Sequence, residues 1–527
     1  MPGTTKSALV TTSVPTPEGA ARRDAFSAHA SVAWDRLPLL IAAASLIIGF
    51  AAAVYYSSAG LALAHYDARA HLVVARRIID SLTPGWQQVG AVWLPLPHLL
   101  NMLPVQIDSM YRSGASAIAI SVVSTALAAW ALSSVILRVT GSASGAIAAS
   151  ALLLLNPNVL YLQSTPMTEP LLFATTLAGI ALAAAWIDGD KRWPVGAGLA
   201  LAAACLTRYE AWPITAAALG LAAAARLRRG ETIQAALAAS LRLALFPAVA
   251  VALFLVNSRW TVGSWFISGG FFVAENTEAL GHPLVAWDQV RKGLYRLSGT
   301  GLVWSGYAGA ALTIIAFARS RSRAPLVLLL ALAGAAALPW YAYVQGHPFR
   351  LRYGVPLVAA CAALGGAAIG LLWTRVQPFV AAAVVAIAIV QAQPLDRGAP
   401  LIAESQRDAA NRVGRRAVTA YLVQHYDGRT IMMSMGSLGH YMQDLSAQRF
   451  RIHDFLHEGN GDIWNFAMTQ PRGVVGWIAI EEKAEGGDAL YLETKRHTAF
   501  LDGFTRVAEG GGVALYRQVL QGSTRFY

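Results

Sequence analysis

Apolar stretches long enough to cross a lipid bilayer recur along this chain from about residue 38 to about residue 393. A hydrocarbon core about 30 Å thick takes roughly 17–25 helical residues, and on this basis we predict about eleven transmembrane helices. Their approximate bounds are 37–55, 113–137, 143–155, 170–187, 194–206, 213–225, 243–257, 301–317, 325–343, 355–373 and 378–390. Only 13% of the residues are charged, whereas a soluble domain averages about 25%. The sequence therefore predicts a mainly α polytopic membrane protein.

The two ends of the chain differ in composition from this apolar middle. Residues 1–37 are rich in Thr, Ser, Pro, Ala and Arg, which is typical of a disordered tail. Residues 394–527 return to the composition of a soluble domain, with strand-like runs at 430–435, 474–480 and 513–516 between helical pieces. We therefore predict a disordered cytoplasmic tail at 1–37, a transmembrane domain at 38–393 and a small extracytoplasmic α/β domain at 394–527.

The connections between the predicted helices are of two kinds. One kind is short and basic, and includes Arg138, Arg192, Arg226, Arg319 and Arg375. The other kind includes two long connections, 57–112 and 258–298, that are rich in Trp, Pro and His. Basic residues gather in cytoplasmic loops, so we place the N-terminus inside and, with an odd number of helices, the C-terminal domain outside. The same rule accounts for much of the net charge of +12 without nucleic acid as a partner. We expect a bacterial inner-membrane protein surrounded by lipids.

The first outer connection reads YDARAH over residues 66–71. If Asp67 opens a helix, its carboxylate lies where the exposed amides favour it, and His71 follows one turn later on the same face. A carboxylate just outside the first membrane helix can act as a general base, or it can simply cap the helix. Apolar residues at 72–79 suggest that this helix lies on the bilayer surface.

Further along the same connection, residues 90–98 read GAVWLPLPH. Trp93 is typical of an anchor at the membrane interface. His98 is a candidate ligand for phosphate, sugar or metal, and the alternative is an ordinary hydrogen-bonded histidine.

Carboxylates also stand at the outer ends of two later predicted helices. Glu169 precedes Pro170 at a first helical turn, where it can complement the helix dipole, orient an acceptor or hold a divalent ion beside Asp67. Arg208 and Glu210 lie between two apolar segments, where ionisable groups are costly and often functional. The alternative for these two is a mutual ion pair.

The fifth outer connection reads GHPFRLRY over residues 346–353. His347, Arg350 and Arg352 make a compact cationic site on the outer side. Guanidinium groups match phosphate oxygens in geometry and charge, so this segment indicates a phosphate site rather than arginines that only reach toward the membrane surface.

In their order and shared outer position, these motifs resemble the C-type (GT-C) superfamily of membrane glycosyltransferases, which includes protein O-mannosyltransferases and bacterial aminoarabinose transferases. The resembling segments are 66–71, 93–98, 167–170, 206–212 and 350–353. The resemblance implies a GT-C-like catalytic domain at 38–393 that moves a sugar, with inversion, from a polyprenyl-phosphate-linked lipid donor. It implies an extracytoplasmic acceptor, which can be a glycan, a lipid or a protein.

The resemblance also implies roles for the outer residues. Asp67 matches the catalytic base, and Glu169 matches a second acidic residue that assists the acceptor or a metal, so a divalent cation bound by these two carboxylates is one option for a cofactor. The residues expected to bind the donor phosphate are Arg208, Arg350 and Arg352. The residues expected to bind the remaining substrate are His71, Trp93, His98, Glu210, His347 and Tyr353.

A lipid or glycan transporter, or flippase, is the main alternative function. It would also explain the membrane helices and their ionisable residues, but it favours repeated halves and broken midplane helices, which the sequence does not show clearly. Transfer of an acyl or phosphoryl group from a lipid, and a glycan-binding scaffold without catalysis, are further alternatives.

Overall fold

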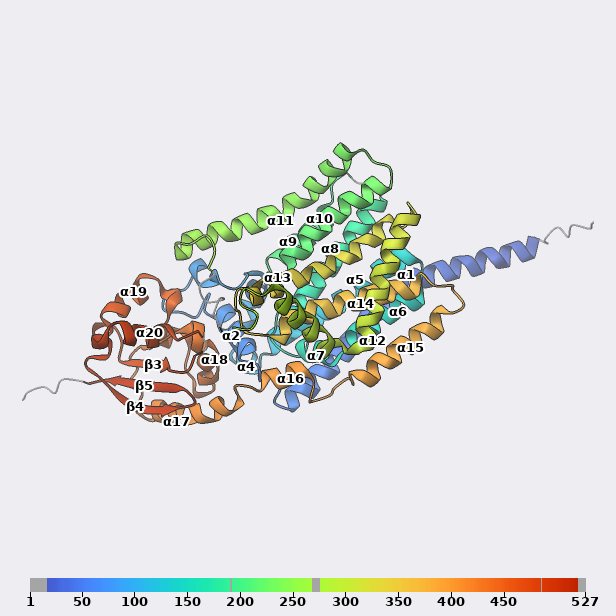
Figure 1. The fold of residues 1–527 in the computed structure, drawn as a ribbon. Helices are drawn as coiled ribbons and strands as arrows, with labels where there is room; N and C mark the ends of the chain where they lie inside the picture. The colour runs from blue at the N-terminus through green and yellow to red at the C-terminus, as the bar shows by residue number, and fades with distance from the viewer. Residues whose placement is uncertain (1–16, 190–191, 268–274, 485, 520–527) are drawn as a thin grey trace, which may run out of the picture.

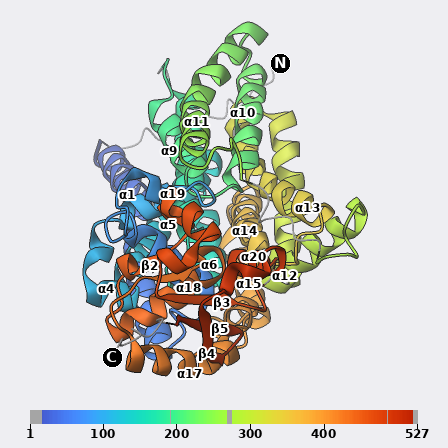
Figure 2. The ribbon, with the colours of Figure 1, turned by 90° about the vertical axis from the view of Figure 1, so that its left-hand side faces the viewer.

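The computed structural model describes residues 17–189, 192–267, 275–484 and 486–519, and it has two parts (Figure 1). The larger part is a bundle of helices, and the smaller part is a domain built around a sheet at one end of the bundle. Helix α1 projects from the opposite end of the bundle (Figure 1). Figure 2 looks at the molecule from the side of the sheet domain, which lies over the ends of the bundle helices. The N-terminal helix and the C-terminal domain therefore leave the bundle on opposite sides.

Each of the eleven predicted membrane helices falls on a helical segment of the bundle. In chain order these segments are α1 (Pro17–Ser58), α5 (Ala115–Thr140), α6 (Ala143–Leu154), α8 (Glu169–Asp188), α9 (Val195–Cys205), α10 (Ala211–Arg228), α11 (Ile233–Val262), α12 (Pro283–Arg319), η3 (Ala324–Ala336) with α13 (Ala337–Val344), η4 (Leu351–Gly354) with α14 (Val355–Gly370), and α15 (Gln377–Gln391). Among the described residues, seven segments are long and apolar enough to cross a membrane, and α6, α9 and α15 are shorter apolar helices. The polytopic helical architecture is confirmed, while the number eleven stays a prediction.

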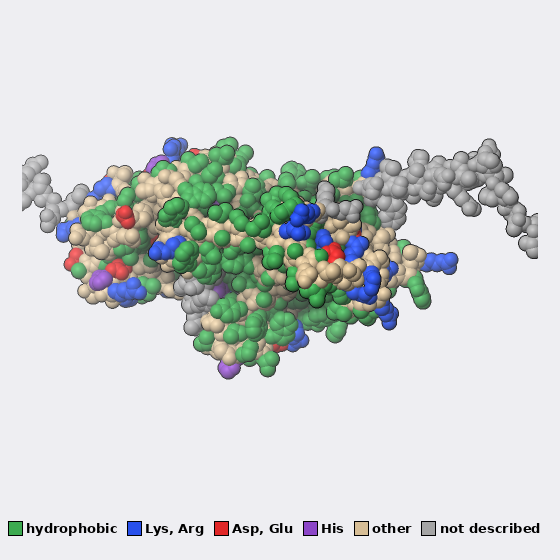
Figure 3. Space-filling model, turned by 90° about the horizontal axis from the view of Figure 1, so that it is seen from above, with side chains coloured by type: hydrophobic (Ala, Val, Ile, Leu, Met, Phe, Trp, Pro, Cys, Tyr) green, Lys and Arg blue, Asp and Glu red, His purple; other side chains and the backbone are tan. Residues whose placement is uncertain are grey.

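Small residues allow the bundle helices to pack closely, as is common in membranes. A Cβ atom on Gly366 of α14 would lie 2.4 Å from the Cβ of Ala149 on α6, and one on Gly309 of α12 would lie 2.0 Å from the carbonyl oxygen of Leu364. Helix α14 is consequently buried along most of its length between α6 and α12. Figure 3 shows hydrophobic side chains over the middle of one face of the molecule and charged side chains toward both ends, as expected of a protein with a lipid-facing belt.

Helix α1 begins at Pro17 and so includes residues 17–37 of the predicted tail. This part of the predicted tail is rich in Ala and has a regular helical continuation into the first membrane segment, which removes the cost of starting a new helix. The rest of the predicted tail, residues 1–16, lies outside the described residues.

The first outer connection folds into α2 (Tyr66–Arg76), η1 (Trp86–Val89), α3 (Leu96–Asn101), η2 (Pro104–Gln106) and α4 (Asp108–Ser113). The prediction that α2 lies on the bilayer surface is wrong. Leu72 and Val73 are fully buried and pack with Leu438 of the C-terminal domain. The apolar face of α2 is therefore covered by protein, because the C-terminal domain presents an apolar helix to it.

The C-terminal domain is a small α/β unit, as predicted. Its elements are α16 (Pro400–Ser405), α17 (Ala409–His425), β1 (Ile431–Met433), α18 (Met435–Leu445), β2 (Phe455–Leu456), α19 (Asp462–Thr469), β3 (Trp477–Glu481), α20 (Ala489–Arg496), β4 (Phe504–Gly510) and β5 (Val513–Gln518). The sheet order is β2-β1-β3-β5-β4, with β1 parallel to β2 and β3, and β5 antiparallel to β3 and β4. The three predicted strands are β1, β3 and β5. The two strands that the sequence did not predict are β2, which has only two residues, and β4, which is partly exposed at the sheet edge.

Candidate active site

Three connections that are predicted to lie on the outer side, and that are far apart in the sequence, meet next to the C-terminal domain. The amide of Leu96 donates to the carbonyl of Leu206 at 3.0 Å, and the hydroxyl of Tyr209 donates to the carbonyl of Val92 at 2.8 Å. The first connection also reaches the fifth, because Asp67 forms an ion pair with Arg352. The residues predicted to carry chemistry therefore belong to one region of the fold.

Asp67 lies in the first turn of α2 and is 6% exposed. The N-cap of this helix is His65, whose Nδ1 accepts a hydrogen bond from the amide of Asp67 at 3.1 Å. The interpretation of Asp67 as the capping residue is therefore wrong, and its carboxylate is available to interact with Arg352. Burial raises the pKa of this carboxyl, but Arg352, His65 and Arg350 together lower the pKa more, so it lies below its ordinary value. Asp67 is consequently an anion.

A second ionic group lies beside the first. Arg208 is 3.0 Å from the Oε1 atom of Glu169 and 2.6 Å from that of Glu210, and it donates to the hydroxyl of Thr168 at 3.0 Å. The predicted ion pair of Arg208 with Glu210 is thus present, and Glu169 joins it. Glu169 is fully buried at the start of α8, and its Oε2 atom has no hydrogen-bond partner in the described structure. Since a buried carboxylate oxygen normally accepts a hydrogen bond, this atom suits a donor supplied by a ligand.

An aromatic group borders this region on the other side. His71 follows Asp67 by one turn on α2, as predicted, and its Nδ1 lies 3.0 Å from Nε2 of His98. The indole of Trp93 stacks against the ring of His71, with ring centres 4.0 Å apart. Burial lowers the pKa of His98 to about 3 and lowers that of His71 well below its ordinary value. Both imidazoles are therefore neutral, and this pair offers hydrogen bonds and ring faces rather than charge.

The fifth connection holds its arginines in a short turn, η4. The hydroxyl of Tyr343 donates to the carbonyl of Arg350 at 2.8 Å, and the guanidinium of Arg352 lies 5.4 Å from the centre of the Tyr353 ring. The ring of His347 meets that of Tyr353 edge-on, with centres 5.4 Å apart. The four predicted residues of this connection therefore lie close together, and Arg352 connects them to Asp67.

Glu404 was not predicted as a site residue, although it lies beside these arginines. It belongs to α16, it is 5% exposed, and its Oε2 atom accepts a hydrogen bond from the amide of Leu351 at 3.2 Å. Burial raises the pKa of its carboxyl. Because Glu404 stands at the start of an ordinary amphipathic stretch, no local sequence signal connects it with a segment about fifty residues earlier.

Asp67 and Glu169 do not make a metal site in this arrangement. Among the described residues, no group of three or more His, Cys, Asp or Glu side chains is placed to hold a metal ion. Each of the two carboxylates instead faces a guanidinium, Asp67 that of Arg352 and Glu169 that of Arg208. This donor set does not fit a divalent cation.

Comparison with known proteins finds no matching family model and no matching curated protein. It does find two crystal structures of ArnT, an aminoarabinose transferase, from Cupriavidus metallidurans, one bound to undecaprenyl phosphate and one in the apo state. Both have a TM-score of 0.54, with 14% and 13% sequence identity, and each comparison covers 92% of this chain and 98% of that chain. The chain therefore has the GT-C-like membrane fold, as its sequence motifs indicated.

Proposed function

We propose that this protein is an inverting glycosyltransferase that moves a sugar from a polyprenyl-phosphate-linked donor to an acceptor on the outer side of a bacterial inner membrane. The fold is that of ArnT, a protein that has been crystallised with undecaprenyl phosphate. The observation that carries the proposal is the ion pair of Asp67 with Arg352. It places a candidate base and a candidate phosphate ligand, which come from different outer connections, in direct contact.

The arginines account for recognition of the donor phosphate. Arg208, Arg350 and Arg352 all lie close enough to Asp67 to lower its pKa. A lipid phosphate that approaches this group meets several cations at a site with little water, where charge-assisted hydrogen bonds are strong. As the bond between the sugar and the phosphate breaks, negative charge grows on the leaving phosphate, and these guanidinium groups stabilise it.

Donor binding would also activate the base. In the absence of a donor, Arg352 pairs with Asp67 and keeps its pKa low, so the carboxylate is a weak base. A donor phosphate competes with Asp67 for the same guanidinium. Once Arg352 turns to the phosphate, burial dominates at Asp67 and its pKa rises toward the range of an efficient general base.

The reaction then proceeds as one displacement. An acceptor hydroxyl or amine gives its proton to Asp67, and the acceptor atom bonds to the anomeric carbon from the side opposite the phosphate. The bond from this carbon to the phosphate oxygen breaks, and the polyprenyl phosphate leaves with the electron pair. Attack from the far side inverts the configuration at the sugar carbon, by the same logic as in inverting glycosidases.

Other residues of the region have roles in binding. The open Oε2 atom of Glu169 suits a hydrogen bond from the acceptor, while Glu210 holds Arg208 in place. The rings of Trp93 and His71 provide a flat surface for the sugar. His98, His347 and Tyr353 complete the walls of the site.

An apolar groove of 550 Å³ can accommodate the lipid chain. Its walls come from the start of α12 and from the η3 and α13 segment, and include Leu284, Trp287 and Trp340. Trp340 precedes Tyr343 by three residues on α13, a distance of about 4.5 Å along the helix. Since the hydroxyl of Tyr343 donates to the carbonyl of Arg350, one short helix, α13, connects the groove with the arginine segment.

The proposal is tested with purified protein in detergent or vesicles, undecaprenyl-phosphate sugars and candidate envelope acceptors, with the glycosidic product detected by mass spectrometry. The expected result is transfer that the Asp67→Asn variant loses. Movement of labelled lipid or glycan across sealed vesicles without any new glycosidic bond would instead support a transporter.

A further inference from the structure

Helix α2 lies between the bundle and the C-terminal domain, and its two faces have different neighbours. Each helical residue turns the chain by about 100°, so residues two apart point to nearly opposite sides. Asp67 faces Arg352 of the bundle, whereas Arg69 points to the C-terminal domain and is fully buried there. The C-terminal domain therefore holds α2, the helix that carries the proposed base, by the face opposite Asp67.

The contact behind α2 is ionic. Arg69 pairs with Asp444 of α18 and lies 3.0 Å from Asp408, which stands just before α17. Each carboxylate also holds a second arginine: Asp408 is 2.5 Å from Arg415 and Asp444 is 2.9 Å from Arg412. A buried guanidinium that loses one of its carboxylate partners destabilises its surroundings strongly, so this cluster has one preferred arrangement.

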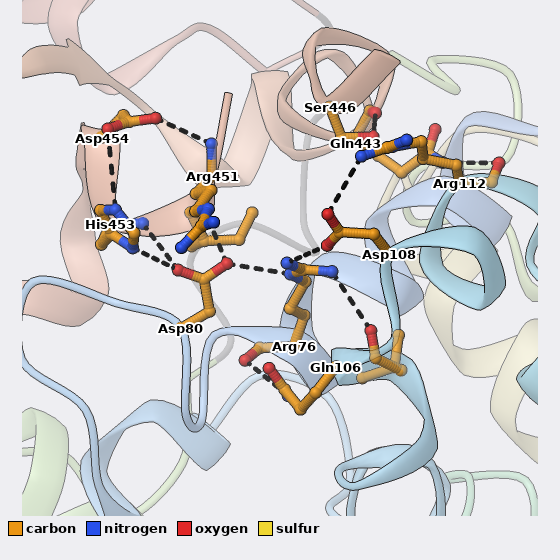
Figure 4. Close-up of polar contacts among 12 residues, drawn as sticks. Arg76, Asp80, Gln106, Asp108, Arg112, Gln443, Ser446, Arg451, His453 and Asp454 are labelled. Atoms are coloured by element: carbon orange, nitrogen blue, oxygen red, sulfur yellow. Dashed lines mark hydrogen bonds and ion pairs between the residues drawn. The ribbon is translucent and has the colours of Figure 1, made fainter. Parts of the chain in front are cut away.

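A second ionic contact fixes the other end of α2 (Figure 4). Arg76 bonds to Asp80 at 2.9 Å and to Asp108 at 2.7 Å, and Asp80 accepts a hydrogen bond from His453 of the C-terminal domain at 2.7 Å. This contact lies about two and a half turns away from Asp67 along the helix. The cluster around Arg69 is therefore the anchor nearest to the proposed base.

We propose that Asp408 and Asp444 are positioning residues, which hold Arg69 and thereby keep Asp67 directed toward Arg352. The proposal rests on the role of Asp67 as base. Helix α2 has only eleven residues, and an isolated helix of this length is marginal in water, so its position depends on contacts to other elements. The C-terminal domain is in this sense part of the catalytic machinery, although its carboxylates do not touch the substrate.

The first test measures the position of α2 without any assay of activity. A Cβ atom on Gly439 of α18 would lie 3.6 Å from the Cβ of Ala70, which is within the range of a disulfide. The double variant Ala70→Cys with Gly439→Cys should therefore form a disulfide readily under mild oxidation, and the native cysteines, Cys205 and Cys361, are both buried. Adding Asp444→Asn or Asp408→Asn should slow disulfide formation at least about tenfold, because the buried cation of Arg69 loses a partner.

A matched control separates positioning from general damage to the domain. Asp427→Asn makes the same chemical change at a carboxylate whose partners Arg429, Arg517 and Trp477 belong to the C-terminal domain itself. It should leave the rate of disulfide formation unchanged, and Asp444→Glu should restore most of the rate that Asp444→Asn loses. Equal rates in the Asp408→Asn, Asp444→Asn and reference proteins would overturn the proposal.

The second test uses the pH profile of sugar transfer. The titratable and charged groups that act on Asp67 are His65, Tyr66, Arg208, Arg350, Arg352, Tyr353 and His440. If α2 shifts, Asp67 stays buried but loses its ion pair with Arg352, so its pKa rises. The acid limb of kcat/KM, which is the pH range where the rate falls because the base becomes protonated, should then move to higher pH. A loss of folded protein would instead lower the rate by the same factor at every pH. Asp444→Asn should therefore move the limb by about one pH unit or more, and Asp427→Asn should not.

The disulfide offers a rescue. Closing the Ala70→Cys, Gly439→Cys bridge in the Asp444→Asn protein should return the acid limb to its original pH, because the bridge replaces the lost anchor. An acid limb that never moves would overturn the proposal. If the unmodified protein transfers no sugar, the proposed function fails, and the rate of disulfide formation alone decides whether the cluster holds α2.

Discussion

Arg352 and Asp67 form an ion pair across the candidate site, one from the connection before α14 and the other from the helix that follows α1. Each residue has a further use in the proposed reaction, as phosphate ligand and as base. Their pairing means that donor binding and base activation are coupled. In the proposed reaction, the donor phosphate and Asp67 compete for one guanidinium.

Asp67→Asn should lower kcat by roughly 10²- to 10⁴-fold, the usual contribution of a general base. It should also bind undecaprenyl phosphate more tightly than the unmodified protein, since Arg352 no longer has an anionic partner. Turnover and binding of undecaprenyl phosphate, measured on the same preparation, test both the expected loss of rate and the expected gain in affinity. Asp427→Asn in the C-terminal domain is a suitable control and should change neither quantity.

Arg352→Ala should raise the KM for the donor about tenfold or more, because a charge-assisted bond to phosphate contributes roughly 1.5–3 kcal/mol. Arg352→Lys keeps the charge but loses the guanidinium fork, so its KM for the donor should lie between those of the unmodified protein and of Arg352→Ala. A donor titration of the three proteins at constant acceptor concentration gives the order of their KM values. An unchanged KM in Arg352→Ala would remove this residue from the phosphate site.

The pH profiles should differ between free and donor-bound protein. The acid limb of kcat/KM reports the free protein, in which the pKa of Asp67 is below its ordinary value, and this limb should lie below about pH 4. The acid limb of kcat reports the donor complex and should lie at higher pH, because Arg352 has turned to the phosphate. Coincident limbs would show that donor binding does not change the pKa of the base.

The same pKa affects stability. A carboxyl whose pKa is lowered by folding stabilises the protein above its unfolded pKa of about 4, and this contribution is lost as the pH falls through the lowered folded value. Thermal unfolding of the unmodified protein should therefore lose more stability between pH 5 and pH 3 than that of the double variant Asp67→Asn, Arg352→Gln. Parallel curves for the two proteins would argue against a lowered pKa at Asp67.

Glu404→Gln should have a KM for the donor close to that of the unmodified protein, whereas Glu404→Leu should raise this KM severalfold. The glutamine keeps an oxygen that accepts from the amide of Leu351, and leucine removes it, so the turn that carries Arg350 and Arg352 loosens. Donor KM and kcat measured separately distinguish this effect from a general loss of folded protein. If both variants lose activity equally, the charge of Glu404 matters more than its hydrogen bond.

Much of the architecture could be predicted because each membrane helix corresponds to a continuous apolar run in the local sequence. Each predicted apolar run coincides with a helical segment of the bundle. The basic short connections predicted that Asp67, Arg208 and Arg352 lie on one side of the membrane. Burial of α2 could not be predicted in this way. Its apolar face suits a lipid surface as well as a protein surface, and only the presence of α18 decides between them.

Side-chain partners that are distant in the sequence could not be predicted for the same reason. Local sequence was sufficient for helix type, order and the set of ionisable residues at the outer ends, because these depend on residues within a few turns of each other. It could not show that Glu404 supports the arginine turn or that Arg69 is held by Asp444. These contacts join segments separated by whole helices or domains, so they exist only once the bundle and the C-terminal domain have packed.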